Sequence, residues 1–494
     1  MHDTRHFDVL IVGAGISGVA AAYHLTRQAS AHTFVMLEAK ESYGGTWLTH
    51  TYPGVRSDSD LYTFGYRFKP WTGAPIACGA AIRRYMGEVI EEAGLDTHIR
   101  YGHRVERATW SSQEKRWTVE ARRVASGETV CFTAGFLWMC QGYYRHEEGY
   151  TPQWPGMKEY RGRIVHPQTW PEDLDIHGKQ VVVIGSGATA ATLVPSIADE
   201  CAHVTMLQRS PTYFACANNA NELADRLRAL QIDASWIHEI VRRQILQEEA
   251  QFTRRSFEEP DVVRQELLAG VSEFLGPELT EKHFSPGYRP WRQRLAFVPD
   301  ADLFRAIQSG KASVETGEIE RFTTGGLVLK SGKTVCADVV ITATGFNLCV
   351  MGDIQFTVDG KPIDFAATVT YRGMMFSGVP NLAYVFGYLR SSWTLRADLV
   401  GDFVCRLLNH MQSRGTSQVE ISLPPEELSQ PRLPWIEPDN FNPGYLLRAL
   451  HLLPRRLDKP EWQHSQDYMS DRNSFPAIDL DGREFVYDGL FEMA

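Results

Sequence analysis

The sequence lacks several patterns that mark other classes of protein. Its eight cysteines form no C-x-x-C pair, which argues against a zinc knuckle and against a dithiol redox centre. It has no long basic run, and its formal net charge is -10, so it carries no electrostatic footprint for nucleic acid or an anionic membrane. No apolar stretch reaches the length of a membrane span. These absences argue against a nucleic-acid partner, a transmembrane segment and a dithiol flavin reductase.

The remaining composition is typical of a large globular enzyme. The chain has 494 residues, of which 43% are hydrophobic and 22% charged, and this length predicts two or more domains. The N-terminus, Met1 to Phe7, is polar, and the apolar run after it carries Asp8 and glycines rather than a signal-peptide core. We therefore expect a cytoplasmic protein.

A glycine fingerprint follows the first predicted strand, Phe7 to Val12, and precedes an Ala-rich helix. In a dinucleotide-binding fold, glycines at this spacing permit a tight turn, close approach of a pyrophosphate, and packing of the helix on the strand. The next predicted strand, Thr33 to Leu37, ends in an acid that is placed to hold a ribose hydroxyl. The candidate ligands are Gly13, Gly15, Ser17, Gly18 and Glu38.

A second fingerprint, in the G-x-G-x-x-A form, follows the predicted strand Gln180 to Ile184. The strand after it ends near Arg209, with no acid. An acid there would repel a 2'-phosphate, whereas Arg209 can pair with it, so this site should prefer NADPH. The alternative is that Arg209 is only a solvated surface charge. The candidate ligands are Gly185, Gly187, Ala188, Thr189, Arg209 and Ser210.

Two fingerprints in one chain predict two nucleotides, of which the first is normally a flavin that accepts hydride from the second. The segment Gly44-Gly45-Thr46-Trp47 supports a flavin, because its glycine backbone can approach the ring closely and Trp47 offers a flat apolar wall. Trp47 as an ordinary core residue is the alternative. The further FAD candidates are Gly45, Thr46, Trp47 and Gly142.

The order of predicted elements indicates an α/β protein with two Rossmann-like domains, for FAD and NADP, and a helical insertion. We assign residues 1–148 and 343–494 to the FAD-binding domain, and residues 149–216 and 286–342 to the linker and NADP-binding domain. Residues 217–285, which are charged and helical, form the insertion. The Pro-rich stretch from Leu423 to Pro443 resembles an extended tail on the surface.

The segment Tyr160-x-Gly162-x-x-x-His166-x-x-x-Trp170-Pro171 resembles the F-x-G-x-x-x-H-x-x-x-W-P fingerprint of Baeyer-Villiger monooxygenases. It also lies where that family has it, just ahead of the NADP fingerprint. Nearly the whole chain is similar to this class B flavoprotein family, and most to its ethionamide-activating type, in segments such as LEAKESYGGTW, RSDSDLYT and QRSPTYF.

The resemblance implies a catalytic pair. Arg294 matches an arginine that lies beside the flavin in the family, and Asp58 matches an aspartate that hydrogen-bonds this arginine. The chemistry is reasonable, because a peroxyflavin anion needs a fixed cation that does not deprotonate. Without the family, a surface ion pair is the alternative. Gln293 stands where many members have a lysine that holds the 2'-phosphate, which places more of the NADPH preference on Arg209.

The resemblance also implies a role for the linker between the domains. His166 is expected to be essential because it senses NADP binding and couples the two domains, and not because it acts as a general base. Thr344 and Gly345 belong to an A-T-G signature where the chain crosses back from the NADP domain to the FAD domain. We include both as candidate cofactor ligands.

The implied reaction is the NADPH- and O2-dependent conversion of a ketone to an ester or lactone through a C4a-peroxyflavin, with S-oxidation of thioethers or thioamides as a second activity. Aromatic residues in Phe386 to Trp393 suggest an apolar substrate, with further walls expected from Trp47 to Phe68 and from the insertion. Three alternatives stay open: an N- or S-oxygenating flavin monooxygenase, an NADPH-flavin oxidase or reductase, and a non-catalytic redox sensor.

Overall fold

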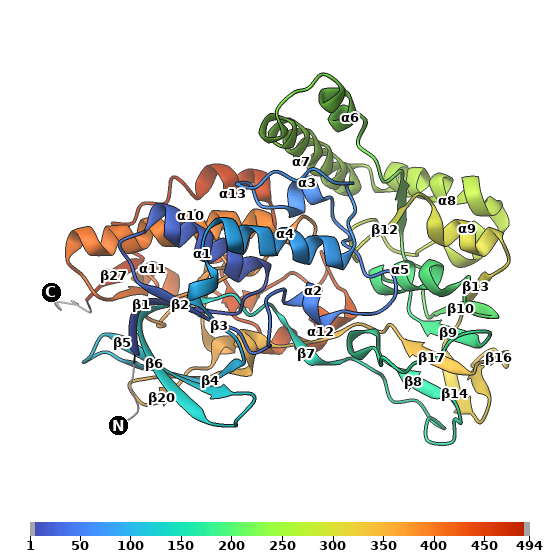
Figure 1. Ribbon diagram of the computed structural model, residues 1–494, viewed down its shortest axis with the longest axis horizontal. Coiled ribbons are helices and arrows are strands. Elements are labelled where there is room, and N and C mark those ends of the chain that lie inside the picture. The colour runs from blue at the N-terminus through green and yellow to red at the C-terminus, as the bar shows by residue number, and fades with distance from the viewer. Residues whose placement is uncertain (1–4, 489–494) are drawn as a thin grey trace.

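The computed structural model describes residues 5–488, which form two α/β halves joined side by side (Figure 1). The first half is built on a mixed sheet whose parallel part has the order β6-β1-β2-β3. Strands β4 and β5 extend it as an antiparallel meander, and β23 joins β6 in parallel. The bounds are β1 (Arg5–Val12), β2 (Phe34–Leu37), β3 (Ile99–Arg100), β4 (His103–Ser111), β5 (Arg116–Arg123), β6 (Thr129–Met139) and β23 (Leu382–Tyr384).

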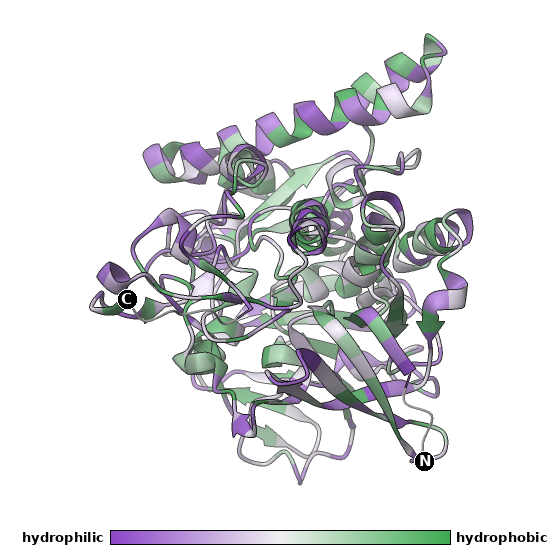
Figure 2. Ribbon diagram, turned by 90° about the vertical axis from the view of Figure 1, so that its left-hand side faces the viewer, coloured by the Kyte–Doolittle hydropathy of each residue, from purple (hydrophilic) through white to green (hydrophobic). Residues whose placement is uncertain are grey.

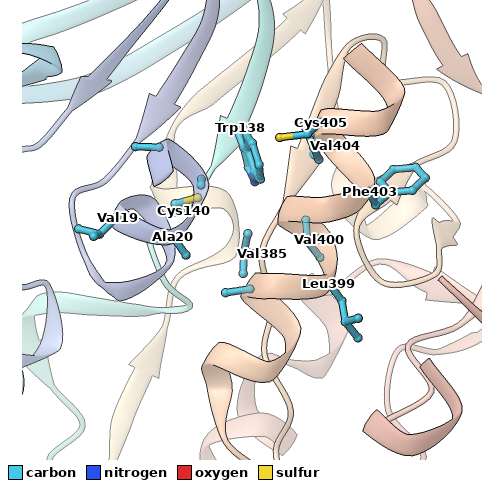
Figure 3. Close-up of a cluster of buried hydrophobic side chains, with 14 of the residues drawn as sticks. Val19, Ala20, Trp138, Cys140, Val385, Leu399, Val400, Phe403, Val404 and Cys405 are labelled. Carbon is cyan, nitrogen blue, oxygen red and sulfur yellow. The ribbon is translucent and has the colours of Figure 1, made fainter. Parts of the chain in front are cut away.

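Helices α1 (Ile16–Gln28) and α10 (Trp393–Arg414) pack together on one face of this sheet. Figure 3 shows Trp138 of β6 between them, close to Val404 and Cys405 of α10. The Trp138 side chain is fully buried. This core joins residues from both ends of the chain, so the first half is complete only when the C-terminal region has returned to it.

The second half is a parallel sheet of order β13-β10-β9-β17-β8, with α5 and α9 against it. A small antiparallel sheet, β14-β15-β16, is attached to it. The bounds are β8 (Arg163–Val165), β9 (Gln180–Ile184), α5 (Ala188–Ile197), β10 (His203–Gln208), α9 (Asp302–Gln308), β13 (Ala312–Thr316), β14 (Ile319–Thr323), β15 (Gly326–Leu329), β16 (Thr334–Cys336) and β17 (Val339–Thr342).

The inserted region contains α6 (Glu222–Ala229), α7 (Ala234–Glu258) and α8 (Pro260–His283). Helices α6 and α7 project above the rest of the molecule in Figure 1, and the long helix at the top of Figure 2 carries both hydrophilic and hydrophobic residues. Arg242 anchors α7 to the first half, because its buried Nη1 donates to the carbonyls of Tyr62, Thr63 and Gly65 at 2.9, 3.1 and 3.0 Å.

Shorter elements complete both halves. Those that contribute residues to the cavity described below are α2 (Thr46–Thr49), α3 (Leu61–Phe64), β7 (Tyr144–Gly149), β18 (Phe346–Leu348) and α12 (Gly444–Ala449). Helix α4 (Gly79–Glu92) and strands β11 (Phe214–Ala217) and β12 (Ala296–Pro299) contribute none. The others include β19 (Gln355–Val358), β20 (Lys361–Pro362), β24 (Val419–Ile421), α11 (Pro425–Leu428), α13 (Tyr468–Ser474) and β27 (Phe485–Tyr487).

The predicted fold class is confirmed, and one local prediction is wrong. The Pro-rich tail does not lie only on the surface, since Trp435 and Phe441 are 2% and 3% exposed and pack into the core of the first half.

Among residues 5–488, no helix is both long and apolar enough to cross a membrane, and residues 1–4 of the polar N-terminus lie outside that range.

Candidate active site

A cavity of about 1320 Å³ lies between the two halves and is lined by residues from both. Nearly all the predicted cofactor ligands line it, together with the predicted catalytic residue Arg294, although they come from segments far apart in the sequence. Those are Gly13, Gly15, Ser17, Glu38, Gly45, Thr46, Trp47, Asp58, Gly142, Gly185, Gly187, Ala188, Thr189, Arg209, Ser210, Arg294, Thr344 and Gly345. Gly18 and His166 do not line it. The insertion was expected to supply a wall, and this is wrong, because no described residue from 217–285 lines the cavity.

The first fingerprint fits a bound pyrophosphate. Helix α1 has Gly15 as its N-cap, with no side-chain cap and no acid in its first turn, so its first N–H groups are left for phosphate oxygens. Gly18 lies beneath the turn, where an added Cβ would collide with the Gly13 carbonyl. Glu38 is buried, and its carboxylate accepts from the Ala14 and Lys40 N–H groups at 2.7 and 2.9 Å. Burial raises the pKa of Glu38.

The second fingerprint also leads into a helix whose N-terminus is left free for a phosphate. Helix α5 has Gly187 as its N-cap, again with no side-chain cap and no acid in its first turn. A Cβ at Gly187 or Gly345 would meet nothing within 4 Å, so there is room for a ligand at both. Arg209 is exposed and lines the cavity. Glu318, which the local sequence did not point to, lines it too, but this carboxylate is paired with Lys330.

Arg294 and Asp58 form a bidentate ion pair at the cavity wall. Arg294 donates from Nε and Nη2 to the two Asp58 oxygens at 2.7 and 2.9 Å, and from Nη1 to the Leu389 carbonyl at 2.8 Å. Both side chains are about a third exposed. Burial opposes both charges, but the pair outweighs it, so the pKa of Asp58 lies below and that of Arg294 above its usual value. Both groups are therefore charged at neutral pH.

Aromatic side chains surround the pair, and most were not predicted individually. Trp393 stacks on Tyr143 with ring centroids 5.2 Å apart and donates from Nε1 to Ser17 at 2.8 Å. Trp47 packs edge-on against Phe64 with ring centroids 5.7 Å apart. Tyr143 and Tyr445 also line the cavity. Tyr143 directly follows the predicted ligand Gly142, which was the only local signal for it.

His166 lies outside the cavity, where the chain crosses between the halves. Its Nε2 donates to the Gly345 carbonyl at 3.1 Å, and its Nδ1 accepts from the Gln168 N–H at 3.2 Å. These two bonds require the neutral ring with its proton on Nε2. Burial lowers the pKa of His166, which favours the same form. A neutral histidine held by main-chain groups suits a structural link better than proton transfer.

Comparison with known proteins is consistent with this geometry. Residues 7–264 match the pyridine nucleotide-disulphide oxidoreductase family, and the chain belongs to it. The chain is 46% identical over 472 residues to the FAD-containing monooxygenase EthA of Mycobacterium tuberculosis, covering 95% of each chain. It is 40% identical over 486 residues to the probable FAD-binding monooxygenase AlmA of Acinetobacter baylyi, covering 98% of this chain and 96% of the other. The protein is a class B flavin monooxygenase of the Baeyer-Villiger type.

Solved structures share the fold of this monooxygenase. A steroid monooxygenase bound to NADP superposes with a TM-score of 0.78 at 21% identity, covering 98% of this chain and 99% of the other. Cyclohexanone monooxygenase from a Rhodococcus species, bound to NADP+, gives 0.73 at 20% identity, covering 98% and 99%. FAD and NADP are the cofactors of this family, and the match with the disulphide oxidoreductases does not extend to their dithiol motif, since the eight cysteines form no C-x-x-C pair.

Proposed function

We propose that this enzyme uses NADPH and O2 to convert apolar ketones to esters or lactones, and that it oxidises the sulfur of thioethers or thioamides as a second activity. The observation that supports this most is the Arg294–Asp58 pair, held at the wall of a cavity that both fingerprints reach. When bound, the flavin supplies the redox chemistry, since it takes hydride from NADPH and activates O2.

We assign FAD to the first fingerprint with Glu38, Thr46, Trp47 and Gly142, and NADPH to the second with Arg209, Ser210, Thr344 and Gly345. The N-termini of helices α1 and α5 both adjoin this cavity, and each has N–H groups that can bind a phosphate. On this proposal, residues 1–148 and 343–494 bind FAD, residues 149–216 and 286–342 bind NADPH, and residues 217–285 are an insertion.

Arg294 retains hydrogen-bonding capacity for the reaction. A guanidinium has five N–H donors, and three of those of Arg294 point to Asp58 and Leu389. One N–H therefore remains on Nη1 and one on Nη2. A fixed cation with free donors stabilises negative charge that develops on a ketone oxygen during attack. Asp58 keeps the guanidinium oriented and its charge paired at the partly exposed cavity wall.

The aromatic walls favour an apolar substrate. Trp47, Phe64, Tyr388 and Trp393 line the cavity near the pair and offer little hydrogen bonding to a substrate. They replace part of the water around Arg294, whose side chain is about a third exposed, and this strengthens its electrostatic effect. All eight cysteines are free, which is the state of thiols in a reducing compartment and supports a cytoplasmic location.

The test is to supply the purified yellow protein with NADPH, ¹⁸O2 and a series of ketones and thioethers. We expect one ¹⁸O atom in the ester or sulfoxide for each NADPH consumed, with little hydrogen peroxide. Peroxide equal to the NADPH consumed, unchanged by any substrate, would show an oxidase instead. Oxygenation of amines or sulfides alone, with no ester from any ketone, would favour the N- or S-oxygenating alternative.

A further inference from the structure

Three arginines lie together beside the cavity without a carboxylate partner. Nη2 of Arg289 and Nη2 of Arg390 both donate to the main-chain and side-chain oxygens of Asn440, at 2.9 to 3.0 Å. Their guanidinium carbons lie 4.2 and 5.1 Å from the centre of the Phe257 ring. Arg292 is the third member, and its charge acts on Arg289. Among residues 5–488, none of the three forms an ion pair with an acid, in contrast to nearby Arg294.

The cluster is electrostatically unfavourable as it stands. Burial, together with the charge of Arg289, lowers the pKa of Arg390 to about 10. Burial and the charge of Arg292 lower the pKa of Arg289 in the same way. Neutral oxygens of Asn440 and the ring of Phe257 offset only part of this repulsion, because neither carries a negative charge. An anion between these groups would stabilise all three cations.

Two buried donors in the same loop also lack acceptors. Nε of Arg292 and Nε1 of Trp291 are buried and have no hydrogen-bond partner within residues 5–488. Trp291 has a φ of 61°, which is rare for a bulky side chain and occurs mainly where a ligand or another contact holds the strained backbone. Unsatisfied buried donors are uncommon and call for a missing acceptor. The positive charge and the free donors therefore indicate the same kind of ligand.

The cluster adjoins the wall of the cavity that holds Arg294. Arg390 lies between Leu389 and Ser391, which both line the cavity, and Leu389 is the residue that accepts from Arg294. Arg292 precedes Gln293 and Arg294, which line it as well. The three arginines do not themselves line the cavity, so an anion held by the cluster would lie at the edge of this wall, next to the loops that carry Arg294 and Leu389.

We propose that Arg289, Arg292 and Arg390 bind the carboxylate of an otherwise apolar substrate, so that its carbonyl or sulfur lies beside Arg294. This rests on the proposed function and adds the substrate class to it. A planar guanidinium matches a carboxylate in two hydrogen bonds, and the apolar cavity accommodates the chain attached to it. Preferred substrates would then be oxo acids or thioether acids rather than neutral ketones.

The test compares an aliphatic methyl ketone with its ω-carboxylate analogue of the same length, using the FAD-loaded enzyme. Arg390→Met keeps the length of the side chain without its charge, and Arg472→Met on the exposed face of α13 is the matched control. We expect KM for the oxo acid to rise about tenfold or more in Arg390→Met. KM for the neutral ketone and KM for NADPH should change less than about twofold.

Two kinetic outcomes would overturn the proposal. An equal rise in KM for both ketones would mean that Arg390 only supports the fold, and a rise in KM for NADPH alone would mean that the cluster binds the 2'-phosphate. Calorimetry of a saturated fatty acid and of the alcohol of the same length, on the oxidised enzyme without NADPH, gives an independent measurement. Tighter binding of the acid than of the alcohol, lost in Arg390→Met, is expected even if the protein oxygenates no ketone. Equal binding of acid and alcohol would contradict the inference.

Discussion

At the scale of single residues, Arg294 depends on its shape as well as its charge. Lysine would keep the positive charge but could not bind both Asp58 oxygens and the Leu389 carbonyl in the same plane. We expect Arg294→Lys to lower the rate of ester formation roughly 100-fold, while NADPH is still consumed and its electrons leave as hydrogen peroxide. The ratio of ester to peroxide per NADPH measures this. Arg163→Lys, in an exposed ion pair, is the control, and normal coupling in Arg294→Lys would contradict the assigned role.

The predicted preference for NADPH over NADH depends mainly on Arg209, and the side chains near Arg209 should modify this preference. It lines the cavity together with Gln293 and Glu318. Removing the cation in Arg209→Ala should raise KM for NADPH about tenfold and leave KM for NADH unchanged. Gln293→Lys should act in the opposite direction, because it adds a second cation. Steady-state kinetics with both nucleotides test this, and equal effects on NADPH and NADH would refute a contact with the 2'-phosphate.

At the scale of elements, the C-terminal segment before α13 supports Arg294, the proposed catalytic residue. Gln466 accepts from the Leu389 N–H at 2.7 Å and donates to Nδ1 of His464 at 3.0 Å. The carbonyl of Leu389, in turn, accepts from Arg294. Gln466 thus orients Arg294 through one residue, and it is a positioning residue because it does not line the cavity.

Gln466→Leu should therefore lower kcat for ester formation and raise the share of peroxide, with little change in KM for NADPH. We expect a decrease of about tenfold, since a small displacement of a catalytic group is costly. Gln466→Glu keeps an acceptor for the Leu389 N–H and should recover part of the coupling. Gln412→Leu, on the exposed side of α10, controls for the loss of an amide. A loss of stability with unchanged coupling would show that Gln466 is only structural.

Elements with local signals were predictable from the sequence, and contacts between distant elements were not. The turn and helix after β1 and after β9 follow from glycine spacing within a few residues, because each turn must be tight where a phosphate approaches. Asp58 and Arg294 are 236 positions apart, and only the family resemblance joined them. Gln466 and the arginine cluster gave no local signal at all, since Gln466 bonds to Leu389, 77 positions away, and Arg390 bonds to Asn440, 50 positions away.

The insertion shows the limit of arguing from composition. Residues 217–285 are helical as predicted, but α7 is anchored by Arg242 to carbonyls outside the cavity, so the described part of the insertion forms no wall. Its sequence indicated helices correctly, because the spacing of apolar and charged residues along a short segment is enough to predict a helix. Where those helices dock depends on one buried arginine and three main-chain carbonyls, which no periodic pattern encodes.

At the scale of the whole molecule, the two halves meet at the crossing that His166 holds. The chain passes from the first half to the second after Gly149 and returns at Gly345. His166 donates to the Gly345 carbonyl. A Cβ at Gly149 would collide with the His166 ring. Gly149→Ala should slow flavin reduction by NADPH about tenfold or more, because the halves would no longer align, while the FAD content is unchanged. Stopped-flow absorbance measures the rate, and Gly270→Ala, which meets nothing within 4 Å, is the control. An unchanged rate would contradict the coupling role.

The stability of the whole molecule should depend on pH through His24, which joins α1 to α10. His24 is 2% exposed, with Nε2 at 3.2 Å from Asp398 and Nδ1 at 3.4 Å from Asp402. Burial alone would lower the pKa of His24, but these two aspartates raise it to about 9. Arg67 and Arg242, at 2.9 Å from Asp402 and 3.8 Å from Asp398, share the same carboxylates.

Because the folded pKa is raised above the unfolded value, His24 stabilises the protein fully below about pH 6.5 and loses this contribution as the pH rises through about 9. The difference amounts to roughly 3 kcal/mol. Thermal unfolding of the FAD-loaded protein between pH 6.5 and 9.5 should show a falling midpoint. His24→Asn should be less stable at pH 6.5 and should lose most of this dependence, whereas His451→Asn, at an exposed site, should retain it. If His24→Asn keeps the full pH dependence of the unfolding midpoint, groups other than His24 must cause it. The charge network between α1 and α10 would then not be the origin of the pH-dependent stability.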